Sequence, residues 1–220
     1  MADIALYGAT GMIGSRILRE ALSRGHKVTA VMRDVTKVQN APNLDVKSGD
    51  ILKPESVAAA AAGNSVLVSS YGPPRGGDPK DALIAIRSLM EGVVAAKKAT
   101  GKPMRLIVVG GAASLEVAPG VQLLDSPNFP PAWKPVASIY RDVLGILKSE
   151  GAAAKLDWTY FSPAAFIQPG ERTGKFRLGT DQLVVDSKGE SRISAEDYAV
   201  ALVDEIEKPQ FIGRRFTAAY

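Results

Sequence analysis

The sequence predicts a Rossmann-like α/β domain: a doubly wound, mostly parallel sheet with helices on both faces and a small C-terminal extension. Segments of strand composition alternate with segments of helical periodicity, the order expected of parallel strands joined by crossover helices. A glycine-rich turn directly follows the first strand and opens the first helix. The 220 residues, 46% hydrophobic and 23% charged, have the composition of one globular domain, with no linker or repeat dividing residues 1–220.

Seven apolar segments have the composition of strands. They are residues 3–7, 27–32, 44–47, 65–70, 104–109, 156–161 and 215–219. Helices are expected between them wherever apolar residues recur with helical spacing. These segments are residues 12–24, 54–62, 79–100, 136–150 and 195–207.

The regular alternation ends near residue 161. Beyond it, short apolar segments at 175–177 and 183–186 are expected to pair as a hairpin. Ser194 is expected to cap the last helix, because a serine followed three residues later by an acidic side chain, here Asp197, is typical of a helix N-terminus.

Two loops interrupt the pattern. The Gly/Pro-rich loop 72–79 contains Arg75, which either reaches a cofactor phosphate or is solvated. The proline-rich loop 114–135 is longer than compact domains usually need, which favours a lid over a substrate. Its aromatic residues Phe129 and Trp133 either stack on a planar substrate or anchor the loop to the core.

The glycine turn has the spacing of a dinucleotide-binding turn. The first glycine, Gly8, permits a sharp bend, Gly11 lets the backbone approach a pyrophosphate, and Gly14 lets helix and strand pack closely. The helix N-terminus would direct free N–H groups and a positive dipole end at the phosphates. The alternative is a tight turn without a ligand. The candidate cofactor-binding residues here are Gly8, Thr10, Gly11, Met12, Ile13 and Gly14.

The residues that end the second strand bear on the choice of dinucleotide. An acidic residue there binds the 2′-hydroxyl of NAD, whereas a basic one accepts the 2′-phosphate of NADP. Arg33 comes first and offers a planar fork that matches phosphate, unless it is a solvated loop residue. Asp34 follows, either as a helix N-cap or as a ribose contact. The pair favours NADP (NADPH), with NAD possible.

The ends of three further strands supply the remaining candidates, because ligands of open α/β sheets bind outside the carboxyl ends of the strands. They are Asp50, Ile51, Ser70, Tyr71, Gly72, Gly110 and Gly111. Asp50 either accepts a hydrogen bond from the adenine amino group or caps the helix that begins near Pro54.

The run 8–14, with Arg33 and Gly49-Asp50-Ile51, resembles the atypical short-chain dehydrogenases. More narrowly, the chain resembles bacterial NAD(P)H-binding flavin-reductase-like proteins, relatives of biliverdin reductase B and the NmrA-like proteins. The resemblance extends through four later segments, residues 108–117, 157–166, 169–174 and 191–199.

The resemblance implies a Rossmann fold, a reduced nicotinamide cofactor, and flavins or similar conjugated acceptors as the substrate class. It also implies that the segment 162–166 lies against the cofactor, which adds Ser162, Pro163, Ala164 and Phe166 to the candidate residues. Residues 114–135 and 162–192 are expected to form the substrate side.

The sequence departs from typical short-chain dehydrogenases at Tyr140. Those enzymes carry Tyr-x-x-x-Lys, whose lysine lowers the tyrosine pKa, but here the fourth residue on is Leu144. Without a cation one turn down the helix, Tyr140 is expected to be a pocket wall or core residue more than a general acid. Ser114, after the fifth strand, either hydrogen-bonds the substrate or forms a turn. Ser114 and Tyr140 are the candidate catalytic residues.

These residues predict an NAD(P)H-dependent oxidoreductase that reduces a flavin- or quinone-like acceptor by direct hydride transfer. Carbonyl reduction needs a positioned proton donor, whereas a conjugated ring delocalises the charge and takes its proton from solvent. The alternatives are an NADP(H)-sensing regulator of the NmrA-like type without turnover, and a reductase or epimerase of a sugar-like substrate.

Composition excludes several other classes. The chain has no cysteine and one histidine, so disulfides are absent and a transition-metal site is not expected. The net charge of +4 is scattered, which speaks against nucleic acid, and no apolar run of about 18 residues suggests a membrane span. We expect a small-molecule substrate, a monomer or homodimer, and, because no secretory signal is recognisable, the cytoplasm.

Overall fold

The computed structural model describes residues 1–73 and 76–220; Arg75 and its contact with a phosphate lie outside the described residues. The core is an eight-stranded sheet of order β10-β12-β8-β5-β4-β1-β2-β3, parallel except for the pair β10–β12. Its strands are β1 (Asp3–Tyr7), β2 (Lys27–Met32), β3 (Leu44–Ser48), β4 (Val66–Ser69), β5 (Arg105–Val109), β8 (Asp157–Ser162), β10 (Arg177–Gly179) and β12 (Arg214–Ala219). The expected doubly wound α/β fold is confirmed.

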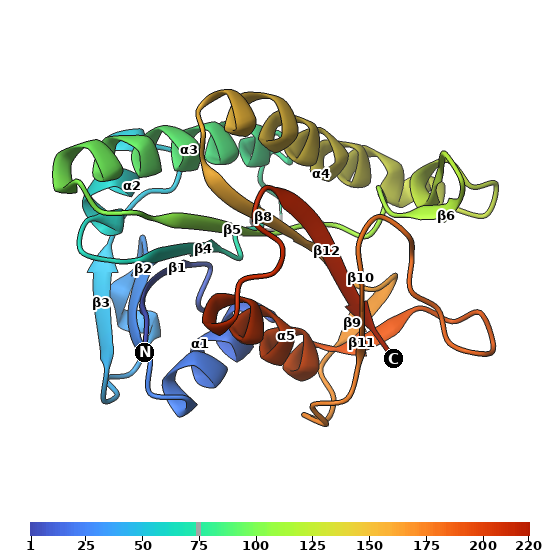
Figure 1. The fold of residues 1–220 in the computed structure, drawn as a ribbon, viewed down its shortest axis with the longest axis horizontal. Coiled ribbons are helices and arrows are strands. Elements are labelled where there is room, and N and C mark those ends of the chain that lie inside the picture. Colours follow the sequence, from blue (N-terminus) through green and yellow to red (C-terminus); the bar gives the residue numbers. More distant parts are fainter. Residues whose placement is uncertain (74–75) are drawn as a thin grey trace.

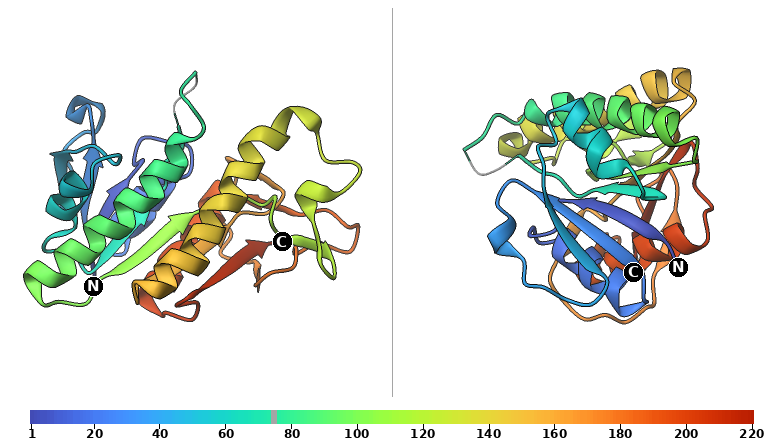
Figure 2. Two further views of the ribbon diagram at one scale, coloured as in Figure 1. Left: turned by 90° about the horizontal axis from the view of Figure 1, so that it is seen from above. Right: turned by 90° about the vertical axis from the view of Figure 1, so that its left-hand side faces the viewer.

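Helices cover both faces of the sheet (Figure 1). On one face lie α2 (Pro54–Ala61), α3 (Asp81–Thr100) and α4 (Lys134–Ile146), and on the other α1 (Gly14–Ser23) and α5 (Ala195–Glu207). Viewed from above, α3 and α4 lie side by side across their face (Figure 2, left). Each face buries its own apolar cluster, so the sheet is covered on both sides, as a parallel sheet requires.

The strand order reverses between β1 and β4. From β1 the chain winds outward to β2 and β3, then returns to β4 and winds the other way through β5 and β8. Such a reversal opens a crevice at the carboxyl ends of the two central strands. The glycine turn directly follows β1, so it lies at this switch point.

The expected hairpin of residues 175–177 and 183–186 is wrong. Residues 183–186 form no strand, and β10 pairs instead with the edge of β12, Arg177 opposite Ala219. The guanidinium of Arg177 donates to the carbonyl oxygens of Val185 and Tyr220, both at 2.6 Å. The segment after β10 is therefore held by the Arg177 side chain and by an isolated bridge with Glu116, whose carbonyl accepts from the Leu183 amide and whose amide donates to the Asp181 carbonyl, both at 2.8 Å.

The long loop 114–135 has local structure of its own. It contains β6 (Glu116–Ala118), β7 (Val121–Gln122) and two short 3₁₀ turns, Leu123–Asp125 and Pro131–Trp133. After β8, the strands β9 (Phe166–Gln168) and β11 (Arg192–Ser194) pair in parallel, apart from the main sheet. At the start of α5, the Ser194 hydroxyl accepts from the Asp197 amide at 2.9 Å, which confirms the expected N-cap.

α4 begins two residues earlier than expected and continues into a π-helical turn, Leu147–Gly151. No helix in the described part of the chain combines the length and apolar character needed to cross a bilayer.

Candidate cofactor-binding site

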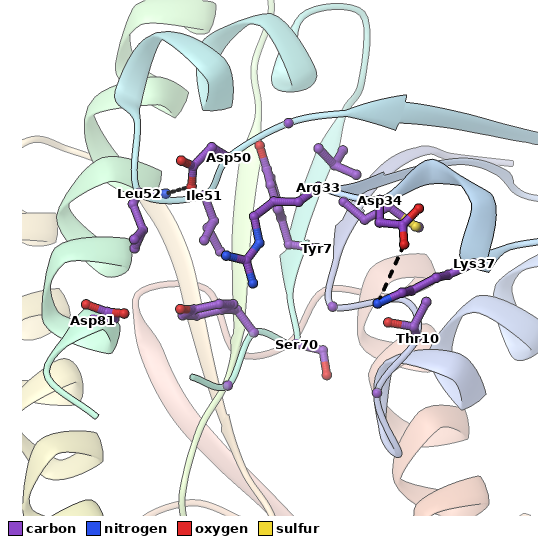
Figure 3. Close-up of a pocket in the computed structure, with 17 residues that line it drawn as sticks. Tyr7, Thr10, Arg33, Asp34, Lys37, Asp50, Ile51, Leu52, Ser70 and Asp81 are labelled. Atoms are coloured by element: carbon purple, nitrogen blue, oxygen red, sulfur yellow. Dashed lines mark hydrogen bonds and ion pairs between the residues drawn. The ribbon is translucent and has the colours of Figure 1, made fainter. Parts of the chain in front are cut away.

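A cleft of about 620 Å³ lies at the carboxyl ends of β1, β2, β3 and β4 (Figure 3). We call it the cofactor cleft. It brings together half of the predicted cofactor-binding residues: Gly8, Thr10, Gly11, Arg33, Asp50, Ile51, Ser70, Tyr71 and Gly72. Asp34, for which a ribose contact is one of two alternatives, also lines it. Seven further lining residues have no predicted cofactor contact: Tyr7, Val31, Met32, Lys37, Gly49, Leu52 and Asp81.

The glycine turn has no space for side chains at its first and last glycines. Gly8 adopts a φ of +79°, and a Cβ there would lie 2.3 Å from the carbonyl oxygen of Ser70. A Cβ on Gly14 would lie 2.0 Å from the carbonyl oxygen of Gly8. The turn is therefore folded tightly against the end of β4 and against the start of α1, which brings backbone to the edge of the cleft.

The start of α1 presents unpaired amides. The Gly11 amide donates to the Gly8 carbonyl at 3.0 Å, but those of Met12, Ile13 and Gly14 have no protein acceptor within the described residues. The first turn of α1 also carries no acidic side chain. Free N–H groups at the positive end of a helix dipole bind anions, so this turn fits the pyrophosphate of a dinucleotide.

Arg33 follows β2 and extends across the cleft between Asp50 and Ser70 (Figure 3). Its guanidinium makes no hydrogen bond or ion pair with any residue that the structure describes. An exposed, unpaired guanidinium at the rim of a cleft can take a phosphate in a bidentate fashion. The side chain is thus placed as the sequence analysis required, while its binding of a 2′-phosphate stays a prediction.

Asp34 serves as an N-cap. Its carboxylate accepts from the amide and the hydroxyl of Thr36, at 3.1 and 2.6 Å, at the start of a 3₁₀ turn, Val35–Lys37. These hydrogen bonds lower the pKa of the Asp34 carboxyl. Lys37 closes the turn, its Nζ 3.8 Å from Asp34, and adds a second cation to the rim. In the sequence, Lys37 could have been found as a second basic residue four positions after Arg33.

Asp50 holds the far end of the cleft through hydrogen bonds of its carboxylate and of its amide. Its carboxylate accepts from the Leu52 amide at 3.0 Å, and its own amide donates to the Ser56 hydroxyl at 2.9 Å. The alternative that Asp50 caps α2 is wrong, because Lys53 is the N-cap residue and no side chain caps that helix. Contact of Asp50 with adenine stays a prediction.

Tyr7 lies beside this end of the cleft. Burial raises the pKa of its phenol to about 12. The neighbouring Gly49 is required by packing, since a Cβ there would lie 2.5 Å from Val31 Cγ1.

Tyr140 lies between the ends of β4 and β5. A Cβ on Gly72 would be 3.5 Å from its hydroxyl, and one on Gly111 would be 3.2 Å from its Cβ. Burial, with a smaller effect of the neighbouring Tyr71, raises the pKa of the Tyr140 phenol. A raised pKa is the opposite of what a general acid working near neutral pH needs.

Ser114 is buried and already engaged. Its hydroxyl oxygen accepts from the Arg215 guanidinium at 3.0 Å, and its carbonyl oxygen accepts from the same nitrogen at 2.8 Å. Arg215 also pairs with Asp181 at 2.5 Å. Substrate binding by Ser114 stays a prediction, and this arrangement speaks against it.

The remaining predicted residues do not line the cofactor cleft. They are Met12, Ile13, Gly14, Gly110, Gly111, Ser162, Pro163, Ala164 and Phe166. Met12 to Gly14 continue the glycine turn, and Ser162 to Ala164 are buried at the end of β8. Phe166 is 65% exposed and borders a second cleft, of about 600 Å³, formed with residues 168–171, 173, 190, 192–194 and 220. In the long loop, Trp133 is 57% exposed and so does not anchor it to the core.

The geometry of the glycine turn agrees with the family to which the sequence matches. Residues 8–209 match the family model described as NAD(P)H-binding. The chain belongs to this NAD(P)H-binding family. A nicotinamide dinucleotide is therefore the cofactor that the glycine turn and the unpaired amides of α1 fit.

Three solved structures are similar over nearly their whole length. A candidate exported protein from Burkholderia pseudomallei is 50% identical, with a TM-score of 0.89 and full coverage of both chains. A candidate epimerase from Bacteroides thetaiotaomicron is 37% identical, with a TM-score of 0.88, covering 100% of this chain and 97% of that one. A candidate NADH-flavin reductase from Streptococcus pneumoniae TIGR4 is 32% identical, with a TM-score of 0.84, covering 100% of this chain and 99% of that one.

The cytoplasmic location of this protein stays a prediction.

Proposed function

We propose that this family member is an NADPH-dependent reductase of a flavin- or quinone-like acceptor, acting by direct hydride transfer. The observation that carries the proposal is the environment of Tyr140. This tyrosine lies between two strand ends next to Gly72 and Gly111, yet burial raises its pKa and no lysine follows it one turn along α4. The hydroxyl at the position where short-chain dehydrogenases keep their acid is thus poorly suited to donate a proton.

The lack of a suitable general acid at Tyr140 favours some reactions of a reduced nicotinamide over others. Reduction of a carbonyl creates an alkoxide that needs a proton at once. In a flavin or quinone, the negative charge spreads over the ring, and the proton can come from water. The bound cofactor supplies the hydride, and the protein has to bind it, orient it and exclude water. The relative described as a candidate NADH-flavin reductase supports this class of acceptor.

The proposed preference for NADPH rests on the rim of the cofactor cleft. Arg33 is unpaired among the described residues, and Lys37 brings a second positive charge from the next turn. Asp34, which lies between Arg33 and Lys37 in the sequence, caps that turn by accepting from the Thr36 amide. Two cations against one carboxylate, which is ionised but bound to its cap, leave the rim with a net positive charge and favour a 2′-phosphate over a 2′-hydroxyl.

A second candidate function, a reductase or epimerase of a sugar-like substrate, is favoured by one observation. The Bacteroides relative, at 37% identity, is described as a candidate epimerase. That chemistry removes and returns a proton at a hydroxyl, so it needs an acid–base group near the nicotinamide. Tyr140, with its raised pKa, is a poor group for this task.

Oxidation of NADPH against a panel of flavins, quinones, aldehydes and nucleotide sugars tests the proposal. We expect FMN or a quinone to be turned over at least about tenfold faster than any aldehyde, a difference of about 1.4 kcal/mol in barrier height. Because free flavins react slowly with NADPH, a Gly14→Ala protein, whose turn is blocked, serves as the background control.

Two results would overturn the proposal. Preferred reduction of aldehydes, or interconversion of a nucleotide sugar, would favour the second candidate. Tight NADPH binding with no turnover of any acceptor would show a cofactor-sensing regulator instead of an enzyme.

A further inference from the structure

Tyr160, in β8, links two elements that border the proposed nicotinamide end of the site. It is fully buried. Its hydroxyl donates to the carbonyl oxygen of Tyr140 in α4 at 2.9 Å and accepts from the amide of Gly111 at 3.1 Å. One phenol oxygen thus spans the backbone that follows β5 and the backbone of the helix that carries Tyr140.

The ring of Tyr160 also forms the floor beneath Gly110. A Cβ on Gly110 would lie 2.1 Å from two carbon atoms of this ring and 2.5 Å from its hydroxyl. A glycine is therefore the residue that fits there, and its backbone rests directly on the aromatic ring. Burial raises the pKa of the Tyr160 phenol, so the group stays neutral and can donate and accept at once.

The contacts around Tyr140 connect this floor to the cleft. Tyr140 packs against Gly111 on one side and has its hydroxyl near Gly72 on the other. Gly72 lines the cofactor cleft. The Tyr160 hydroxyl therefore joins the backbone after β5 to the middle of α4, and the Tyr140 side chain extends from there to the backbone after β4.

We propose that Tyr160 is a positioning residue for the nicotinamide end of the site: its hydroxyl fixes the Gly111 amide to the Tyr140 carbonyl, and its ring supports Gly110. The proposal rests on the proposed function in placing the nicotinamide over the Gly110–Gly111 turn. Tyr160 touches neither cofactor nor acceptor and acts by holding the surface on which the ring lies. The adenine end, built by β2 and β3, does not depend on it.

The chain offers a matched control in Tyr198 of α5. It is also a fully buried tyrosine, and its hydroxyl donates to a backbone carbonyl, that of Phe161, at 2.6 Å. Tyr198 packs in the apolar cluster on the opposite face of the sheet and lines no part of the cofactor cleft. Tyr198→Phe and Tyr160→Phe each remove one buried hydroxyl. The Tyr160 hydroxyl bonds the Gly111 amide directly, whereas that of Tyr198 shares the Phe161 carbonyl with the Gly110 amide, which keeps its own hydrogen bond of 2.8 Å when the hydroxyl is removed.

The test compares the two variants in three measurements: the thermal midpoint, the Kd for NADPH with the emission of the bound nicotinamide, and kcat with FMN. We expect both variants to lose thermal stability. Tyr160→Phe should lower kcat about tenfold and shift the nicotinamide emission, because misplacement of a reacting ring by a fraction of an ångström is enough for such a loss. Its Kd for NADPH should change less than about threefold, because the adenine and phosphate contacts are unaltered. Tyr198→Phe should keep the wild-type kcat and emission.

Equal losses of kcat in both variants would reduce Tyr160 to a structural role, and an unchanged kcat and emission in Tyr160→Phe would contradict the proposal outright. If the wild-type protein binds NADPH but turns over no acceptor, the proposed function fails, while the emission of bound NADPH still decides the role of Tyr160.

Tyr160→4-aminophenylalanine provides a second variant if Tyr160→Phe does not fold. It keeps a donor for the Tyr140 carbonyl and weakens the acceptor for the Gly111 amide. A kcat between those of the wild type and an inactive protein is expected. Wild-type kcat and emission in this variant would show that the Gly111 hydrogen bond positions nothing.

Discussion

The cofactor cleft and the substrate side, which we define as residues 114–135 and 162–192, use polar groups in opposite ways. In the cleft the guanidinium of Arg33, and in the glycine turn beside it the amides of residues 12–14, have no protein partner within the described chain. On the substrate side, several polar side chains are bound to neighbouring elements, although Ser162 Oγ and Gln122 Oε1 are buried without a partner among the described residues. The first region offers unpaired donors to an anionic ligand, whereas the paired groups of the second region hold its backbone in place.

The segment after β9 shows how firmly the substrate side is held. Arg172 donates twice to the carboxylate of Glu20 in α1, both at 2.8 Å, which lowers the pKa of Glu20. Asp197 accepts from the Gly174 amide at 2.7 Å and from the Thr173 hydroxyl at 2.5 Å. These contacts fix residues 172–174 against α1 and α5.

The largest expected effect tests the cleft side of this comparison. In Gly14→Ala the new Cβ would lie 2.0 Å from a backbone oxygen, that of Gly8, which cannot move without opening the turn. We expect the Kd for NADPH, measured by fluorescence titration, to rise more than about 100-fold and unfolding to become easier by about 3 kcal/mol.

Gly145→Ala in α4 is the matched control. No heavy atom lies within 4 Å of the Cβ it would add, so it should raise stability by about 0.5–1 kcal/mol and leave the Kd unchanged. Wild-type affinity in Gly14→Ala would contradict the assignment of the turn to the pyrophosphate.

The second prediction asks whether the unpaired guanidinium of Arg33 reads the 2′-phosphate. Arg33→Ala should weaken NADPH binding by about 10- to 100-fold, the worth of a charged hydrogen bond or two, and NADH binding by less than about threefold. Isothermal titration with both cofactors measures the difference. Arg87→Ala is the control. It removes an exposed arginine of α3 that forms an ion pair with Glu150, and it should change neither affinity. Equal losses for NADPH and NADH would remove the preference for NADP.

The two regions also differ in how far the sequence could predict them. The glycine turn and Arg33 depend on residues adjacent in the chain, so a local pattern was enough to place them in the cleft. The position of β10 was missed, because Arg177 pairs with Ala219 in a strand far along the chain. The partner of Ser114, Arg215, is 101 residues away, and no spacing rule connects the two. Contacts of this range are decided by packing and not by local pattern.

A smaller effect is expected at Tyr140, where the two regions meet. Tyr140→Phe should keep kcat with FMN within about threefold of wild type, because no proton donor is needed for a delocalised acceptor. Its raised pKa means that the phenol stays protonated at all pH values below its ordinary value of 10.0, so wild type and variant should share one pH profile between about pH 6 and about pH 9. A loss of about 1,000-fold, or about 4 kcal/mol, would show that Tyr140 is the acid after all.

The smallest effect on activity is expected at Ser114. Because its hydroxyl oxygen is occupied by Arg215, Ser114→Ala should leave kcat and KM unchanged with every acceptor. The guanidinium keeps the carbonyl of Ser114 and the carboxylate of Asp181, so unfolding should become easier by only about 1 kcal/mol. Chemical denaturation and steady-state kinetics on the same preparation separate the two quantities. A selective rise in KM for the acceptor, with stability unchanged, would mean that the hydroxyl exchanges Arg215 for substrate, and that the substrate side holds polar groups in reserve as the cofactor cleft does.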